Sequence, residues 1–308
     1  MKHNYQTSAP KWRKAKANRG KLFRRMRKHR LRYIAILPSL ITILNGVFGF
    51  TAIALASKDV KPDAGQWSCF TVAGYMVLVA MFADMLDGRL ARMSQSTSSF
   101  GGQLDSLCDM ISFGVAPAFL MLKLVESKLE LGTVVWGGFL HRFIWLAAVA
   151  YIACTAIRLA RFNVENEENE AAHMSFAGLP SPGAAGVIIS IIIFHQEKVP
   201  YFDLLVYLLP FITLGVAILM VSQIPYPHIL NVYLTGKKPF GHLIWILFLL
   251  GLAVCGDLEI ALMLTFGSFA GSSLVKWLYG AAMSRRSRGD LSAHDLTAET
   301  APGPGTHE

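Results

Sequence analysis

Four aspartates lie close together in the stretch DMLDGRLARMSQSTSSFGGQLDSLCDM, which has long apolar sequence on both sides. The carboxylates form two pairs, Asp84 with Asp87 and Asp105 with Asp109. Side chains three or four residues apart share one face of a helix. Each pair is therefore expected to present both carboxylates in the same direction.

Two adjacent glycines, Gly101 and Gly102, lie between the two pairs. We expect them to break the chain and to let a second helix start close to the first. The simplest arrangement is two helix ends that meet with all four carboxylates turned inward. Such charges must be protonated or neutralised by a cation. Oxygen ligands without His or Cys favour Mg²⁺ or Mn²⁺, and Mg²⁺ commonly takes substrate phosphates as further ligands, so the sequence predicts a phosphate-bearing substrate.

The elements that carry these aspartates are predicted to cross a membrane. Of the 308 residues 53% are hydrophobic, and they come in blocks nearly free of charge. These blocks approach the ~20 residues that a helix needs to cross the hydrocarbon core. We therefore expect an all-α integral membrane protein with about eight transmembrane helices. The expected spans are Tyr33–Ala56, Trp67–Asp84, one from near Asp105 to about Leu124, Phe143–Ala160, Gly183–Phe194, Leu204–Val221, Leu243–Cys255 and Ile260–Tyr279.

Basic residues are concentrated before the first span, where residues 1–32 carry thirteen Lys and Arg and no acid. Because Lys and Arg favour the cytoplasmic side, we expect both termini and the aspartate stretch in the cytoplasm, with the protein in the cell's inner (cytoplasmic) membrane. We interpret 1–32 as a basic tail lying on anionic lipid, and expect no nucleic acid as a partner. The membrane domain that carries the site is expected at 33–281, and residues 282–308 are interpreted as a disordered cytoplasmic tail.

The spacing of the aspartate stretch also resembles a family signature. It reads D-x2-D-G-x2-A-R-x8-G-x3-D-x3-D, and it matches the signature of the CDP-alcohol phosphatidyltransferases at every fixed position. The segments LPSLITILNGVFGFTAI, IRLARFNV and GLPSPGAAG extend the resemblance from about residue 33 to at least 190. These flanks are similar to integral-membrane members of the family that use serine as the acceptor alcohol.

The resemblance implies a reaction and a role for each residue of the signature. The phosphatidyl group of CDP-diacylglycerol would pass to the hydroxyl of L-serine, giving phosphatidylserine and CMP, and the protein would be a homodimer. Two Mg²⁺ or Mn²⁺ ions would be held by Asp84, Asp87, Asp105 and Asp109. The contacts to CDP-diacylglycerol would come from Gly88, Ala91, Arg92 and Gly101. Asp109 would also be the general base that takes the proton of the serine hydroxyl, an effect worth ~10²–10⁴-fold in rate.

Further candidates for contacts with the acceptor or with a phosphate are Arg158, Arg161, Ser112 and Asn45. The two arginines share one face at the end of a span, where a guanidinium can bind a phosphate or a carboxylate bidentately. The alternative is that they only reach the membrane surface and set topology. Asn45 lies inside the first span, where a polar side chain often only bonds a neighbouring helix.

The signature itself does not select the acceptor, so alternatives stay open. Free choline would be expected to need an aromatic cage, and we identify none. A polyol phosphate would need extra basic residues around the pocket, and Arg158, Arg161, Lys237 and Lys238 are compatible with that. A divalent-cation transporter would need acidic residues at several depths of the membrane, whereas the other spans have almost none.

Overall fold

The computed structural model describes residues 39–58, 67–94, 99–128, 137–168, 178–222, 224, 256–272 and 275, and within these ranges the chain forms helices and short connections without a strand. The elements in chain order are a first helix Ser39–Ala56, α2 (Cys69–Ser94), α3 (Ser99–Asp109), the π-helix η1 (Met110–Val115), α4 (Ala116–Lys128), α5 (Gly137–Glu168), α6 (Ser181–Lys198), α7 (Asp203–Val221) and a last helix Leu258–Ser272. The tails at 1–32 and 282–308 and the expected span Leu243–Cys255 lie outside the described residues.

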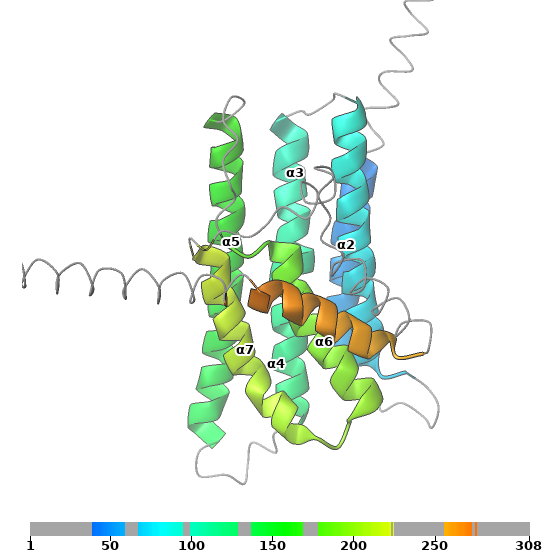
Figure 1. Ribbon diagram of the computed structural model, residues 1–308, viewed down its shortest axis with the longest axis vertical. Coiled ribbons are helices and arrows are strands. Elements are labelled where there is room, and N and C mark those ends of the chain that lie inside the picture. Colours follow the sequence, from blue (N-terminus) through cyan, green and yellow to red (C-terminus); the bar gives the residue numbers. More distant parts are fainter. Residues whose placement is uncertain are drawn as a thin grey trace, which may run out of the picture.

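The helices form an upright bundle in which α2, α3 and α5 stand side by side (Figure 1). α3 continues through η1 into α4 as one long rod. α5 packs on α7 and α2 packs on α6. The last helix, orange in Figure 1, crosses α6, where the rings of Phe266 and Phe269 lie over Gly186 and Gly183. Two glycines on one face of α6 thus give the aromatic rings a flat surface to pack on.

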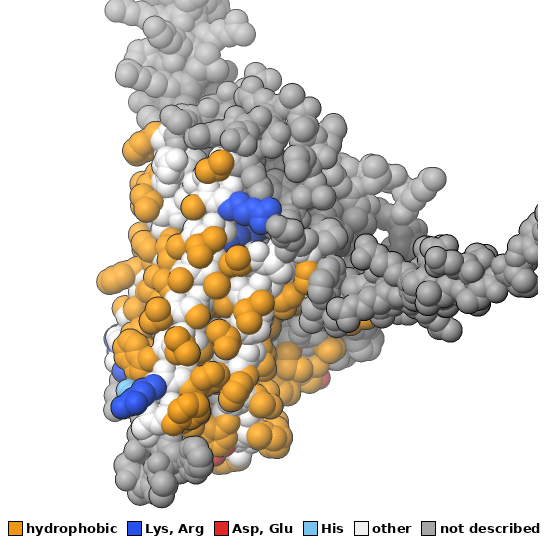
Figure 2. All heavy atoms as spheres, turned by 90° about the vertical axis from the view of Figure 1, so that its left-hand side faces the viewer, with side chains coloured by type: hydrophobic (Ala, Val, Ile, Leu, Met, Phe, Trp, Pro, Cys, Tyr) orange, Lys and Arg blue, Asp and Glu red, His pale blue; other side chains and the backbone are white. Residues whose placement is uncertain are grey.

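Five of the described helical segments are long and apolar enough to cross a membrane. They are Ser39–Ala56, Cys69–Leu90, Phe100–Lys128, Gly138–Val164 and Asp203–Val221. Figure 2 shows one side of the bundle, where hydrophobic side chains cover the middle and basic side chains gather toward the two ends. Such a surface suits a hydrocarbon core bounded by polar headgroups. The expected all-α membrane class is confirmed, whereas the count of eight spans is not.

One expected span on described residues, Gly183–Phe194, differs from the expectation. α6 covers Gly183–Phe194, but it ends in His-Gln-Glu-Lys and is not among the five membrane-length segments. Most of its side chains are buried inside the protein, so its apolar residues pack mainly on other helices. The last helix is described over Leu258–Ser272, and most of the remainder of the expected span Ile260–Tyr279 lies outside the described residues.

The ends of the two aspartate helices also differ from the expectation. The apolar span was expected to end at Asp84, just before two helix ends that meet, but α2 continues without a break to Ser94. Gly101 and Gly102 were expected to break the chain, yet both are helical and lie near the start of α3. A glycine inside a helix costs only about 1 kcal/mol, so these two glycines do not end α3. In the same way, the polar residues of this stretch end the apolar segment without ending the helix. The carboxylates therefore project from helix sides rather than from two helix ends that meet.

Candidate metal centre

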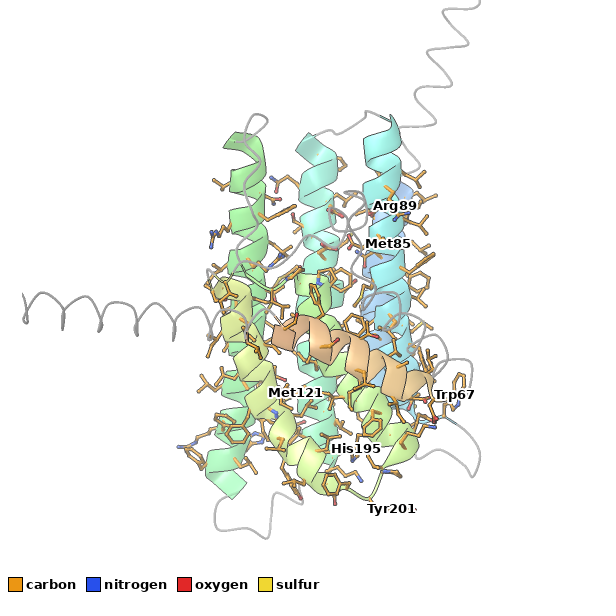
Figure 3. The ribbon with its side chains drawn as sticks, in the orientation of Figure 1. Trp67, Met85, Arg89, Met121, His195 and Tyr201 are labelled. Carbon is orange, nitrogen blue, oxygen red and sulfur yellow. The ribbon has the colours of Figure 1, made fainter. Side chains whose placement is uncertain are left out.

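Three of the four aspartates converge in the structure. Asp84 of α2 and Asp105 and Asp109 of α3 each offer an oxygen, and these atoms all lie within 4.8 Å of one another. Asp84 and Asp105 are half-buried, and Asp109 is buried. Figure 3 labels Met85 and Arg89, the neighbours of this group on α2, in the upper part of the bundle. Trp67, His195 and Tyr201 lie toward the opposite end, so the acidic group belongs to one end of the molecule.

The donor set of this triad fits a hard divalent cation. It consists of carboxylates only, from two helices, with oxygens close enough to share one ion. The nearest cysteine in sequence, Cys108, is buried against Gly46 of the first helix, where an added methyl group would lie 3.1 Å from its Sγ atom. Oxygen ligands without sulfur or imidazole suit Mg²⁺ or Mn²⁺ better than zinc.

Asp87 lies next to the triad but has its own surroundings. Its charge acts on Asp84, Asp105 and Asp109, so it belongs to the same acidic region. Its side chain is only 3% exposed, and it is hydrogen-bonded to the Thr42 hydroxyl and the Gly88 backbone. Its Oδ2 atom has no hydrogen-bond partner among the described residues. A buried carboxylate oxygen without a partner is costly unless something binds it, so Asp87 is compatible with a further ligand position.

Asp109 is connected to the first helix by a hydrogen bond. The Asn45 side-chain amide donates to Asp109 Oδ1 at 2.9 Å. In the reverse direction, the Ser112 hydroxyl donates to the backbone carbonyl of Asn45, also at 2.9 Å. Asn45 and Ser112 are both completely buried. Both were expected to contact the acceptor or a phosphate, and the contacts that the structure gives them are with Asp109 and with each other.

The helix geometry changes directly after Asp109. Residues Met110–Val115 form a π-helix, a form that is often found at functional sites. The buried Tyr151 hydroxyl of α5 donates to the backbone carbonyl of Phe113 at 2.9 Å, which fixes this turn from the opposite side. The acceptor is a backbone carbonyl and not a carboxylate, so we assign Tyr151 to the packing of the rod and not to the acidic group.

The other predicted residues are distributed around the triad. Gly88 faces open space, since an added methyl group there would meet nothing within 4 Å. Arg158 is half-buried, and its guanidinium lies 3.3 Å from the Ser181 hydroxyl at the start of α6. Arg161 is exposed one turn further along α5. Gly101 lies near the start of α3. The side chains of Ala91 and Arg92 lie outside the described part of the structure.

A polar contact that the sequence analysis missed joins the aspartate helix to the arginine helix. Asn163 of α5 donates its amide to the Ser106 hydroxyl of α3 at 2.8 Å. Ser106 directly follows Asp105, and Asn163 lies two residues after Arg161. A polar residue in the segment IRLARFNV was the available signal, but only the packing of α3 beside α5 identifies its partner.

Comparisons with known proteins identify the family of the chain. The sequence model of the CDP-alcohol phosphatidyltransferases matches residues 35–224, which include all four aspartates and most of the bundle. The chain belongs to the CDP-alcohol phosphatidyltransferase family. Together with the apolar helices, membership of this membrane-enzyme family identifies the chain as an integral membrane protein.

Relatives in several organisms carry the same name, CDP-diacylglycerol–serine O-phosphatidyltransferase. The protein from Helicobacter pylori strain 26695 is 32% identical over 247 residues, which cover 79% of this chain and 92% of the relative. The protein from Methanocaldococcus jannaschii is 30% identical over 251 residues, with 81% and 98% covered. The protein from Mycobacterium bovis is 32% identical over 195 residues, 62% of this chain, and the alignment spans only 61% of that relative's length.

Proposed function

We propose that this protein transfers the phosphatidyl group of CDP-diacylglycerol to the hydroxyl of L-serine, with CMP as the second product. The observation that carries the proposal is the carboxylate triad of Asp84, Asp105 and Asp109, whose oxygens lie within 4.8 Å of one another in a chain of this family. The choice of serine is supported by the shared name of the relatives, two of which align over nearly their whole length.

The proposed roles combine the family resemblance with the positions of the described residues. Asp84, Asp105 and Asp109, with Asp87 beside them, hold two divalent cations, Mg²⁺ or Mn²⁺. When bound, such ions offset the negative charge of a diphosphate and of the departing phosphate. The open space at Gly88 suits the nucleotide half of CDP-diacylglycerol, and Ala91, Arg92 and Gly101 are proposed to surround it. Arg158 and Arg161 are proposed to bind a phosphate or the serine carboxylate.

Asp109 is the proposed general base. Its carboxylate accepts the proton of the serine hydroxyl while the hydroxyl oxygen forms a bond to the β-phosphorus of CDP-diacylglycerol. The bond from that phosphorus to the bridging oxygen breaks, and CMP leaves with the bridging oxygen. A hydroxyl is a poor nucleophile until a positioned base shares its proton, which makes the base worth ~10²–10⁴-fold in rate.

The first test is CMP release by the purified protein in detergent. Mn²⁺ or Mg²⁺ is supplied with CDP-diacylglycerol and one acceptor at a time: L-serine, choline, glycerol 3-phosphate, inositol or inositol phosphate. We expect metal-dependent release with serine. Release only with another acceptor would keep the phosphatidyl transfer and reject serine. No release from folded protein with any acceptor would reject the enzyme, and divalent-cation transport would then be the function to examine.

A pair of variants tests the base assignment. Asp109→Asn is expected to remove turnover while retaining most binding of CDP-diacylglycerol, because an amide keeps an oxygen ligand but accepts no proton. Asp84→Asn serves as the comparison, since it removes a charged ligand without touching the base. A binding loss for Asp109→Asn as large as that for Asp84→Asn would contradict the assignment.

The proposal includes an orientation and an assembly. Both termini and the aspartate end of the bundle lie in the cytoplasm, residues 33–281 form the catalytic membrane domain between two tails, and the protein is a homodimer. The thirteen basic residues of 1–32 support the orientation, because Lys and Arg accumulate on the cytoplasmic side. To check the orientation, a single cysteine is placed in each tail of the protein and labelled in intact inner-membrane vesicles. Mass measurement of the detergent-purified protein checks the dimer.

A further inference from the structure

We propose that Asn45 is a positioning residue that fixes the carboxylate of Asp109 for cation binding and proton transfer. This inference deepens the proposed function, on which its catalytic part rests. Three observations on the first helix support it: the hydrogen bond to Asp109, the close approach of the helix backbones around that bond, and the unpartnered oxygen of the Asn45 amide.

The hydrogen bond between Asn45 and Asp109 is buried and joins residues 64 positions apart in the chain. The Asn45 side chain is 0% exposed, so water does not compete for its amide. Asp109 itself is buried within the carboxylate triad. A donor at 2.9 Å restricts rotation of the carboxylate and leaves the second oxygen of Asp109 available to the triad.

Two glycines allow Asn45 to reach Asp109. An added methyl group at Gly46 would lie 3.1 Å from Cys108 Sγ, and one at Gly49 would lie 2.7 Å from Ser112 Cα. The first helix therefore packs closely on the rod of α3 and η1 at two successive positions, against the Cys108 side chain at Gly46 and against the Ser112 backbone at Gly49. Small residues at such positions permit close helix packing in membranes. The sequence Asn45-Gly46 thus places a donor beside the one helix turn that presents Asp109.

The Asn45 amide is used on one side only. Its Nδ2 atom donates to Asp109, whereas its Oδ1 atom is buried without a hydrogen-bond partner among the described residues. A residue that served only to join two helices would gain from satisfying both ends of its amide, because an unsatisfied buried oxygen costs about 1–3 kcal/mol. Among the described residues the Asn45 amide satisfies only the end that faces Asp109, which favours a positioning role over a simple link between two helices.

Thr42 lies one turn before Asn45 on the first helix, and it contacts an aspartate of α2 in the way that Asn45 contacts Asp109. Its hydroxyl is hydrogen-bonded to Asp87, so the same face of the first helix contacts one carboxylate from each aspartate pair. Residues that orient the ligands of a metal site typically change metal affinity or activity by about 10–100-fold when they are removed. This is the range expected for Asn45.

The test compares Asn45→Leu with Tyr151→Phe. Leucine is similar in size to asparagine but cannot donate to Asp109. Tyr151→Phe removes another buried 2.9 Å hydrogen bond, four residues further along the same rod, and its acceptor is a backbone carbonyl rather than a carboxylate. Mn²⁺ affinity is measured by electron paramagnetic resonance titration of each protein in detergent. CMP release with serine at saturating Mn²⁺ then gives kcat and the KM for CDP-diacylglycerol.

We expect Asn45→Leu to lower both Mn²⁺ affinity and kcat by about 10–100-fold. Its KM for CDP-diacylglycerol stays within about threefold, because the lost interaction concerns Asp109 rather than lipid binding. Asn45→Ser, which keeps a donor, is expected to lose less. Tyr151→Phe is expected to lower the melting temperature while Mn²⁺ affinity and kcat stay near those of the wild type. If the leucine variant does not fold, Asn45→Ala replaces it.

Two outcomes would overturn the inference. One is wild-type Mn²⁺ affinity in folded Asn45→Leu, and the other is an equal loss of affinity in Asn45→Leu and Tyr151→Phe. The Mn²⁺ titration does not depend on the reaction. If the wild-type protein releases no CMP with any acceptor, the proposed function fails, while the affinities alone still decide the role of Asn45.

Discussion

The close packing of the first helix on the aspartate rod gives a quantitative prediction for Gly49→Ala. The added methyl group would lie 2.7 Å from Ser112 Cα and closer still to the Ser112 hydroxyl. Carbon atoms pack at about 3.5–4.0 Å, so the two helices must separate locally by about 1 Å. The contact involves the backbone of η1, so no side-chain rotation can relieve it.

This separation acts directly on the site. The 2.9 Å hydrogen bonds from Ser112 to Asn45 and from Asn45 to Asp109 would lengthen toward about 3.9 Å, beyond the range of a hydrogen bond. Overpacking of this kind costs about 1–3 kcal/mol of stability. A displacement of about 1 Å in a catalytic group reduces the rate by about 100-fold, and this is the loss of kcat that we expect for Gly49→Ala.

The assay is CMP release with CDP-diacylglycerol and serine, combined with thermal unfolding in detergent. Gly215→Ala in α7 is the matched control, since an added methyl group there meets nothing within 4 Å and alanine is the better helix former. The double variant Gly49→Ala/Ser112→Ala is expected to stay impaired, because Ser112 Cα remains in the way. Wild-type kcat and melting temperature in Gly49→Ala would refute the close approach and the reasoning built on it.

Three further predictions concern the triad, the far end of the bundle and the last helix. Asp84→Asn should weaken Mn²⁺ binding by at least about tenfold in a titration monitored by electron paramagnetic resonance, because one of three converging charges is lost; unchanged affinity would remove Asp84 from the metal site. Burial, followed by the charge of Lys128, lowers the pKa of His195 from its ordinary value of 6.5, so the unfolded chain takes up the proton first. Stability should therefore fall as the pH drops below 6.5, and melting curves of His195→Gln should show a smaller dependence over that range. Gly186→Ala should lower the melting temperature by an amount equivalent to about 1–3 kcal/mol, because the new methyl group meets the ring of Phe266; an unchanged melting temperature would show that the last helix packs on α6 less tightly.

The sequence by itself determined the class of protein, and it predicted that carboxylates gather on shared helix faces. Apolar blocks of membrane length predict an all-α membrane protein, because an isolated backbone in hydrocarbon must satisfy its hydrogen bonds within a helix. Pairs of aspartates three and four residues apart predict carboxylates on common helix faces, because the helix repeats every 3.6 residues. Both predictions depend on local periodicity alone, and so neither required knowledge of which helices are neighbours.

The ends of the site's helices could not be predicted from local periodicity. The polar stretch after Asp84 was interpreted as the place where the apolar span ends and two helix ends meet, yet α2 continues to Ser94. Polarity reports where a chain leaves an apolar environment, whereas a helix ends where its backbone hydrogen bonds end. Gly101 and Gly102 illustrate the same difference, because glycine permits a break but α3 does not use it.

Only the tertiary structure decided which polar groups meet. It brought Asp84 together with Asp105 and Asp109, gave Asp87 a separate contact with Thr42, and gave Asn45 a partner 64 residues away. Distances between helices depend on how side chains far apart in sequence pack against each other, here the absence of side chains at Gly46 and Gly49 facing the rod of α3 and η1. A local sequence pattern predicts which residues share a helix face. The distance between the faces of two helices depends on how the whole molecule packs.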